Sequence, residues 1–282
     1  MGKKYSVLMS LYIKEKPDYL KSSIESMLTQ TVLPNQIVIV LDGPITVDLE
    51  NIINEYKNSY PSLFTIVALK ENLGLGLALN EGIKYCKNEL IARMDTDDIS
   101  YPERCELQLE EFSKNPSLDI VGTLTSEFYE TPEDIVSSRI VPENHEAIVK
   151  FSKRRSPFNH PTVMYRKSSV TDVGGYRDIL RNEDIDLFVR MIINKSNAKN
   201  IQKELLYFRS NIDNFKRRKS WSNNKNYIKV IFGFWKQGYS TIWDLIFVVI
   251  TQLGMYLSPM WVLKWISETV LRGKSKSKNQ LN

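Results

Sequence analysis

The chain has 282 residues, of which 42% are hydrophobic and 25% are charged, and its formal net charge is +5. These values are typical of a globular protein with a sizeable core, built as one large domain or as one domain with an appendage. No recognised nucleic-acid-binding module accompanies the mild positive charge, which argues against a nucleic-acid partner. The two cysteines, Cys86 and Cys105, lack C-x-x-C spacing, so neither a disulfide framework nor a zinc site is expected.

Short β-branched runs alternate with helical patterns in the first half of the chain. This alternation is typical of a parallel sheet covered by helices, and it predicts an α/β fold with a Rossmann-like, mostly parallel sheet. We expect strands at residues 6–11, 36–41, 64–68 and 90–94, and helices at residues 17–29, 47–60 and 76–87.

The second half predicts further elements of both kinds. Pro102 opens a helix over residues 102–114, and Asn115-Pro116 stops it. Strand-like segments are expected at residues 119–128, 162–165 and 205–208, with a polar loop at 131–134. Apolar residues at helical spacing predict a helix over residues 184–194.

Three carboxylates, Asp95, Asp97 and Asp98, directly follow the apolar run of the fourth strand. Carboxylates that lie close together repel each other and shift each other's titration unless a cation neutralises them. Oxygen ligands favour Mg²⁺ or Mn²⁺, ions that usually bind substrate phosphates as well. The alternative is a solvated turn in which Asp98 or Ser100 caps the following helix.

Polar residues also follow the first two strands. In α/β sheets of this kind, ligands bind at the carboxyl ends of the strands. Tyr12, Asp42 and Asp95 all stand at such ends, so we expect them to converge on one site.

Residues 93–98 resemble the D-x-D(-D) motif of family 2 glycosyltransferases, which are inverting enzymes with a GT-A fold. Other segments resemble that family in the same order along the chain, over roughly residues 5–210. They are residues 6–12 for its first strand, 37–43 for its second strand with the Asp that meets uracil, 72–80 for its N-x-G segment, and Glu183-Asp184 for its E-D pair. The order of the matches is more specific than any single motif.

The resemblance implies a metal-dependent transfer of a hexose from a UDP-sugar. Mn²⁺ or Mg²⁺ would be held by Asp97 with Asp95 and Asp98 nearby, and the choice between Asp97 and Asp98 as the ligand stays open. Asp42, Asn72, Arg93 and Asp95 would contact the donor, where Arg93 either pairs with the aspartates or reaches a phosphate.

The E-D pair implies that Asp184 is the catalytic base, at the start of a helix whose dipole stabilises a carboxylate. A simple capping role for Glu183 or Asp184 is the alternative, and Asp186 competes for the assignment. His160, followed by a proline, resembles a segment near the acceptor site, where Glu183 is also placed. A structural hydrogen bond is an equally good explanation of His160.

Two other matches are weaker. Arg209 resembles a late Y-R position of the family, although Phe208 separates it from Tyr207. Gly74 and Gly76 suggest a dinucleotide-binding loop, but Leu79 stands where that fingerprint needs a small residue. We therefore reject the oxidoreductase interpretation.

Residues 245–263 form an uncharged stretch followed by a basic tail. The stretch is long enough to span a membrane, but Pro259 and several polar residues interrupt it. We expect a helix in the membrane interface, ahead of packing against the catalytic domain and of a true span. The expected division is a GT-A catalytic domain at residues 1–215 and a helical, membrane-associating region at 216–282.

The resemblance and the basic, aromatic C-terminal region together suggest a specific reaction. It transfers Gal or Glc from its UDP-sugar to GlcNAc-diphosphate-undecaprenol, in a β and preferably 1,3 linkage, during O-antigen or capsule synthesis. The apolar run near the N-terminus is too short for a signal peptide, so we expect none, and we expect a peripheral enzyme on the cytoplasmic face of a bacterial inner membrane. One rival is a sugar-nucleotide nucleotidyltransferase, which would need a glycine-rich loop where residues 11–16 have no glycine. The other is a non-catalytic sugar-binding protein.

Overall fold

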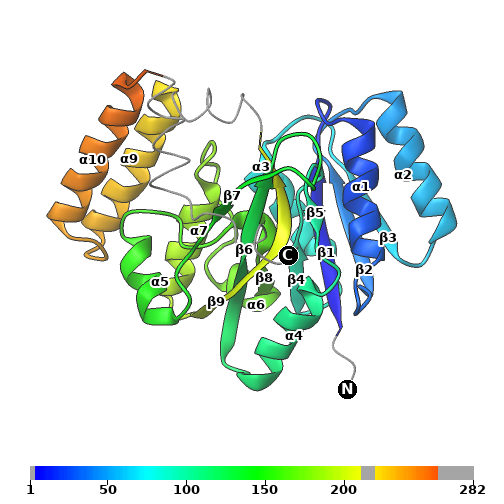
Figure 1. The fold of residues 1–282 in the computed structure, drawn as a ribbon, viewed down its shortest axis with the longest axis horizontal. Coiled ribbons are helices and arrows are strands. Elements are labelled where there is room, and N and C mark those ends of the chain that lie inside the picture. The colour runs from blue at the N-terminus through cyan, green and yellow to red at the C-terminus, as the bar shows by residue number, and fades with distance from the viewer. Residues whose placement is uncertain (1–3, 211–219, 260–282) are drawn as a thin grey trace, which may run out of the picture.

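The computed structural model describes residues 4–210 and 220–259. A nine-stranded mixed sheet with the strand order β3-β2-β1-β4-β8-β6-β9-β5 forms its centre, and β7 pairs with β6 (Figure 1). The strands are β1 Tyr5–Leu11, β2 Gln36–Leu41, β3 Phe64–Ala68, β4 Leu90–Arg93, β5 Ile99–Ser100, β6 Leu118–Phe128, β7 Ile135–Arg139, β8 Met164–Arg166 and β9 Asn197–Arg209. The α-helices are α1 Pro17–Leu28, α2 Val47–Ser59, α3 Leu75–Tyr85, α4 Arg104–Lys114, α5 His145–Ser152, α6 Lys167–Asp172, α7 Glu183–Ile193, α9 Trp221–Lys236 and α10 Ile242–Leu257.

The first four predicted strands and the three helices between them are confirmed. Strands β3, β2, β1 and β4 lie parallel, in that order. Because successive side chains of a strand point to opposite faces, β1 contributes to two cores. Val7 and Met9 pack with α1, α2 and α4, whereas Leu8 packs with α3 and α7. The carboxyl ends of the parallel strands therefore meet at one edge of the sheet.

The prediction of a mostly parallel sheet is wrong for the second half. Strand β8 runs antiparallel to both β4 and β6, and the short β5 runs antiparallel to β9. Only β6 and β9 form a parallel pair there. Strand β8 follows α5 and a 3-10 turn at His160–Thr162 and lies between β4 and β6. Antiparallel neighbours need no helical crossover between them, which allows this direction.

Helices α9 and α10 lie side by side at one end of the molecule and pack against α7 (Figure 1). The small core between them contains Ile185 and Val189 of α7 and Val230, Ile231, Phe234, Leu245 and Val248 of the two C-terminal helices. An ion pair of 2.6 Å between Arg154 and Asp244 adds a polar link. The inner face of the C-terminal region thus packs on the α/β domain, which was one of the sequence alternatives.

Helix α10 ends at Leu257, shortly before Pro259. Within the described residues, no helix is long and apolar enough to cross a membrane. Residues 260–263 of the uncharged stretch, the basic tail and the predicted domain boundary at 215 lie outside the described residues.

Candidate active site

Asp95, Asp97 and Asp98 come together in the loop that follows β4. One carboxylate oxygen from each lies within 4.8 Å of those of the other two. Helix α1 supports this loop, because Ser23 Oγ donates a hydrogen bond of 2.6 Å to the backbone carbonyl of Asp95. The predicted cluster of carboxylates at a strand end is therefore present.

The cluster destabilises its own negative charges. Asp98 is fully buried, and this burial, together with the Asp97 and Asp95 charges, raises its pKa well above the usual range. Burial and the charges of Asp95 and Glu15 raise the pKa of Asp97 to about 7. Among the described residues, Asp98 Oδ2 has no hydrogen-bond partner. An orphaned carboxylate oxygen within an all-oxygen donor set fits a divalent cation such as Mg²⁺ or Mn²⁺.

These shifts predict how stability depends on pH. The pKa of Asp97 rises from 3.8 to about 7 on folding, so the metal-free native state binds more protons than the unfolded state between those values. The free energy of unfolding of the metal-free protein should therefore fall as pH rises from about 4 to about 7. Glu183, whose pKa is also about 7, contributes in the same direction.

If the aspartates hold a divalent cation, Mn²⁺ should reverse this loss, because the cation would bind their ionised forms. The rise in melting temperature on adding Mn²⁺ should be larger near pH 8 than near pH 5, measured by differential scanning fluorimetry. Asp97→Asn should flatten both the pH dependence and the Mn²⁺ effect. An equal Mn²⁺ shift at both pH values would contradict the prediction.

Arg93 lies beneath the cluster and is 1% exposed. Its guanidinium forms an ion pair with Asp95. Of the two roles considered for Arg93, the structure therefore favours pairing with the aspartates over reaching out to a phosphate.

Asp42 and Asn72 are brought together at the end of β2. Oδ1 of Asp42 accepts a hydrogen bond of 2.7 Å from the N–H of Leu73, and Oδ2 accepts bonds from the N–H of Gly74 and from Asn72 Nδ2. A side chain on Gly43 would place its Cβ 2.8 Å from the backbone nitrogen of Asn72, so this close approach needs glycine. Asp42 thus shapes the N-x-G segment, and its contact with uracil stays a prediction.

The E-D pair opens α7, with its two carboxylates in different surroundings. Glu183 is 8% exposed and packs against Gly76 of α3. Burial raises its pKa to about 7, and the charges of Asp184, Arg93 and Asp95 also act on it, which places Glu183 toward the aspartate cluster. Asp184 is half-buried, and its Oδ2 accepts a hydrogen bond of 3.0 Å from Ser156 Oγ.

Asp186, the competitor for the role of base, has a structural environment. Its carboxylate is buried and pairs with Arg190 at 2.7 Å and with Arg177 at 3.4 Å. Arg190 in turn donates hydrogen bonds to the carbonyls of Val173 and Gly175. Asp186 therefore ties α7 to the preceding loop, which favours Asp184 as the base.

His160 is half-buried in the 3-10 turn that precedes β8. Its Nε2 is 2.9 Å from the hydroxyl of Tyr176, and its ring packs edge-on against Phe188. Burial, helped by the Arg93 charge, lowers the pKa of His160 well below its usual value. The geometry therefore favours a structural hydrogen bond for His160 over a contact with the acceptor.

Arg209 is the residue that the sequence pattern undervalued. Its backbone N–H donates to Asp98 Oδ1 at 2.9 Å, and its Nε donates to the carbonyl of Asp97 at 3.0 Å. The guanidinium also stacks on the rings of Tyr19 and Phe128, 3.7 Å and 4.5 Å from their centroids. Arg209 thus joins the end of β9 to the aspartate loop. The late Y-R match pointed to it despite the altered spacing.

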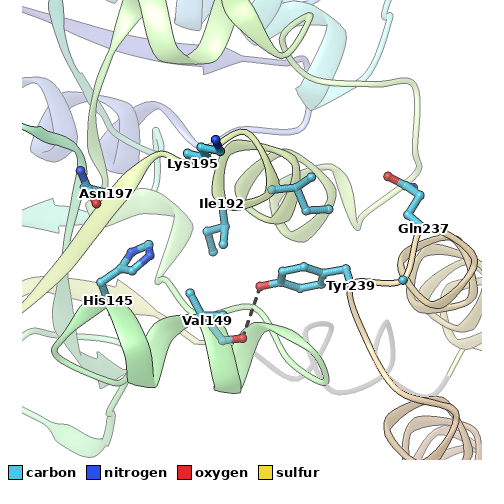
Figure 2. Close-up of a pocket in the computed structure, with 9 residues that line it drawn as sticks. His145, Val149, Ile192, Lys195, Asn197, Gln237 and Tyr239 are labelled. Atoms are coloured by element: carbon cyan, nitrogen blue, oxygen red, sulfur yellow. Dashed lines mark hydrogen bonds between the residues drawn. The ribbon is translucent and has the colours of Figure 1, made fainter.

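A cavity of about 530 Å³ lies at the other end of α7, away from the carboxylates. Figure 2 shows His145, Ile192 and Tyr239 on its walls, and Tyr239 donates a hydrogen bond to the carbonyl of Val149. Neither the aspartates nor the E-D pair line it. The predicted site residues instead gather at the carboxyl ends of the parallel strands and the start of α7.

Comparison with known proteins agrees with this arrangement. The family model described as "Glycosyl transferase family 2" matches residues 6–175. A UDP-Gal:alpha-D-GlcNAc-diphosphoundecaprenol beta-1,3-galactosyltransferase of Escherichia coli is 34% identical, over 95% of this chain and 97% of that protein. The amylovoran biosynthesis glycosyltransferase AmsE of Erwinia amylovora is 37% identical, over 80% of this chain and 82% of that protein.

Solved structures share the fold at low sequence identity. A mannosyltransferase of Pyrobaculum calidifontis, in complex with GDP-Man and Mn²⁺, matches with a TM-score of 0.65 at 14% identity, over 94% of this chain and 73% of that one. S. aureus TarS 1–349 in complex with UDP-GlcNAc matches with a TM-score of 0.60 at 17% identity, over 82% and 71%. The mixed α/β sheet is consistent with the GT-A fold. The chain is a glycosyltransferase and belongs to glycosyl transferase family 2.

Proposed function

We propose that this enzyme transfers galactose or glucose from its UDP-sugar to GlcNAc-diphosphate-undecaprenol, in a β-1,3 linkage. The observation that carries the proposal is the 34% identity, over almost the full length of both chains, to a galactosyltransferase named for this donor and acceptor. The second relative, named for amylovoran biosynthesis, supports a role in polysaccharide assembly such as O-antigen or capsule synthesis.

Two different groups of side chains would accept the proton of the acceptor hydroxyl and stabilise the leaving diphosphate. Asp97, Asp98 and Asp95 would hold Mn²⁺ or Mg²⁺, which when bound supplies positive charge to the departing diphosphate oxygens. Asp184 takes the proton of the acceptor hydroxyl, whose oxygen then forms a bond to the anomeric carbon. The bond from that carbon to the β-phosphate oxygen breaks, and UDP leaves with the electron pair. Because attack comes from the opposite side, an α-linked donor gives a β-linked product.

Other residues of the chain hold the donor side in place. The Asp42 carboxylate fixes the loop at residues 72–74, and we assign the uridine to this loop and the uracil contact to Asp42. Arg93 holds Asp95 in place, and Arg209 holds the backbone of Asp97 and Asp98. This preorganisation costs nothing at the moment of reaction.

The proposal is tested by offering the protein radiolabelled UDP-galactose, UDP-glucose and their N-acetyl forms with Mn²⁺ and a lipid-diphosphate GlcNAc acceptor. We expect incorporation from one of the first two donors, with a β linkage in the NMR spectrum of the product. Release of pyrophosphate from UTP and a sugar phosphate would favour a nucleotidyltransferase. Binding of sugars without any transfer would favour a non-catalytic protein.

We also propose that the enzyme docks on the cytoplasmic face of the inner membrane through α9 and α10. Their outer face exposes large apolar side chains, although their inner face is packed. The exposed fraction is 72% for Trp243, 64% for Ile250 and 75% for Leu257. Apolar and aromatic side chains on the open face of a helix suit the boundary between headgroups and acyl chains.

Replacing Trp243 and Ile250 together with serine should weaken sedimentation with phosphatidylglycerol vesicles by about tenfold or more, because two large apolar groups no longer enter the lipid. Melting temperature should stay close to wild type, since both side chains are exposed. Val47→Ser is the matched control, because Val47 is 70% exposed on α2, at the other end of the molecule (Figure 1). Unchanged vesicle binding of the double variant would rule out this docking face.

A further inference from the structure

Basic residues gather near Asp184, the residue that we assign as the base. Three segments that are distant in sequence are joined by hydrogen bonds, and one of them also bonds to Asp184. They are the end of β7, the loop before Phe158, and the middle of α9. Each segment contributes one side chain, namely Arg139, Arg155 and Tyr227.

Hydrogen bonds fix these three segments to one another. Ser156 Oγ, next to Arg155, donates to the Asp184 carboxylate at 3.0 Å. Tyr227 Oη donates to the carbonyl of Arg154 at 3.0 Å, which ties α9 to the loop. Asn159 Nδ2 donates to the carbonyl of Arg139 at 3.2 Å, which ties the end of β7 to the same loop. The arrangement is built by the fold rather than by mobile surface side chains.

The charges of Asp184, Arg139 and Arg155 all act on the Tyr227 phenol. Burial raises the pKa of the Tyr227 phenol, the Asp184 charge raises it further, and the charges of Arg155 and Arg139 lower it. One carboxylate and two guanidinium groups therefore lie close enough to Tyr227 to act on its phenol, and their two positive charges exceed the one negative charge. Arg154, between them in sequence, turns to Asp244 and the Phe247 ring instead.

Arg139 carries an unsatisfied donor. Its Nε is buried and has no hydrogen-bond partner within residues 4–210 and 220–259. A buried N–H of a charged group that stays unpaired costs free energy, and an anionic ligand would remove that cost. Guanidinium groups bind phosphate oxygens through two parallel hydrogen bonds, which an ammonium group cannot do.

We propose that Arg139, Arg155 and Tyr227 form a binding site for the diphosphate group of the acceptor. This inference rests on the proposed lipid-diphosphate acceptor. Asp184 must meet the attacked hydroxyl, and one sugar ring separates that hydroxyl from the diphosphate. The phosphates therefore lie one ring away from the base, on the side opposite the aspartates that serve the donor.

A transfer assay separates this site from general effects on catalysis. Arg139→Gln and Arg155→Gln should each raise KM for the lipid-diphosphate GlcNAc acceptor by about 10- to 100-fold, the range for a lost charge-assisted hydrogen bond. KM for a neutral alkyl-GlcNAc acceptor and for the UDP-sugar should stay near wild type. Lys114→Gln, which removes one exposed positive charge from α4, is the control and should change neither value. Equal losses with both acceptors would show that the residues are structural, and the proposal would fail.

A binding measurement keeps the test independent of transfer. With Mn²⁺ and saturating UDP present, the full-length protein should bind geranyl diphosphate in calorimetry, and both glutamine variants should weaken that binding about tenfold or more. Arg139→Lys should bind geranyl diphosphate more tightly than Arg139→Gln but less tightly than wild type, because an ammonium group cannot form two parallel hydrogen bonds to a phosphate. Asp97→Ala should leave this binding intact, so a failure of the donor site is distinguished from a failure of this one. If the variants weaken binding to phosphatidylglycerol vesicles but not to geranyl diphosphate, the site serves membrane lipids and the proposal is wrong.

Discussion

Replacing Asp97 with alanine is expected to lower the rate of sugar transfer by at least about 10²–10³-fold, the cost of losing one preorganised electrostatic stabiliser. The physical reason is that the leaving diphosphate loses the cation that the three neighbouring carboxylates would hold. Because Asp97 is destabilised by burial and by like charges, its removal should not lower the melting temperature of the metal-free protein. Transfer of radiolabelled sugar and a melting curve, recorded on the same preparation, measure the two effects.

Asp98→Ala supplies the comparison that identifies the ligand. Asp98 also holds the backbone N–H of Arg209, so its loss should loosen the end of β9 as well as the metal site. If Asp97 is the main ligand, the Asp97 variant should need far more Mn²⁺ for half-maximal activity and keep a wild-type melting temperature. Full activity in EDTA, or in both alanine variants, would falsify the assignment of a metal to this cluster.

The strand ends were the part of the site that could be predicted from the sequence. Asp42 follows a continuous apolar run and Asp95 a short run interrupted by Arg93, and parallel strands bring such ends to one edge of a sheet. What the pattern could not give is the partner of each side chain. Asp42 turns to the loop at 72–74, and Arg93 stays beneath Asp95, because both choices depend on packing between elements that are distant in sequence.

The second half of the sheet shows where periodicity stops being informative. Strand β9 runs from Asn197 to Arg209, but only its apolar residues 205–208 were predicted. The earlier part carries Lys199, Gln202 and Lys203, and pairing with β6 makes it a strand despite its polar composition. Backbone pairing that is set by tertiary contacts overrides local propensity.

Helix α10 illustrates a second limit. It is apolar on nearly all sides, so its sequence does not tell which face is covered. The structure places Leu245 and Val248 inward against α7 and leaves Trp243 and Ile250 exposed. Packing against the catalytic domain and an outer apolar face are therefore both present, although they were weighed as alternatives.

The second large effect concerns the base. Asp184→Asn should lower turnover by about 10²–10⁴-fold, the usual contribution of general base catalysis, because an amide cannot accept the proton of the acceptor hydroxyl. The amide oxygen can still accept the hydrogen bond from Ser156, so the loop and the start of α7 should keep their structure. Affinity for the UDP-sugar, measured by calorimetry with Mn²⁺, should stay near wild type. Collapse of donor affinity would instead make Asp184 a binding or structural residue.

Asp186→Asn is the matched control, two positions along the same helix. It leaves the buried guanidinium of Arg190 without its charged partner, and breaking a buried ion pair costs roughly 3–5 kcal/mol. The melting temperature should therefore fall, while turnover at a temperature where the variant is still folded should stay within a few fold of wild type. Asp184→Asn should therefore lose turnover but keep its melting temperature, whereas Asp186→Asn should lose melting temperature but keep turnover. If Asp186→Asn is folded and inactive while Asp184→Asn is active, Asp186 is the base. Our assignment would then be wrong by two positions, which is about half a helical turn.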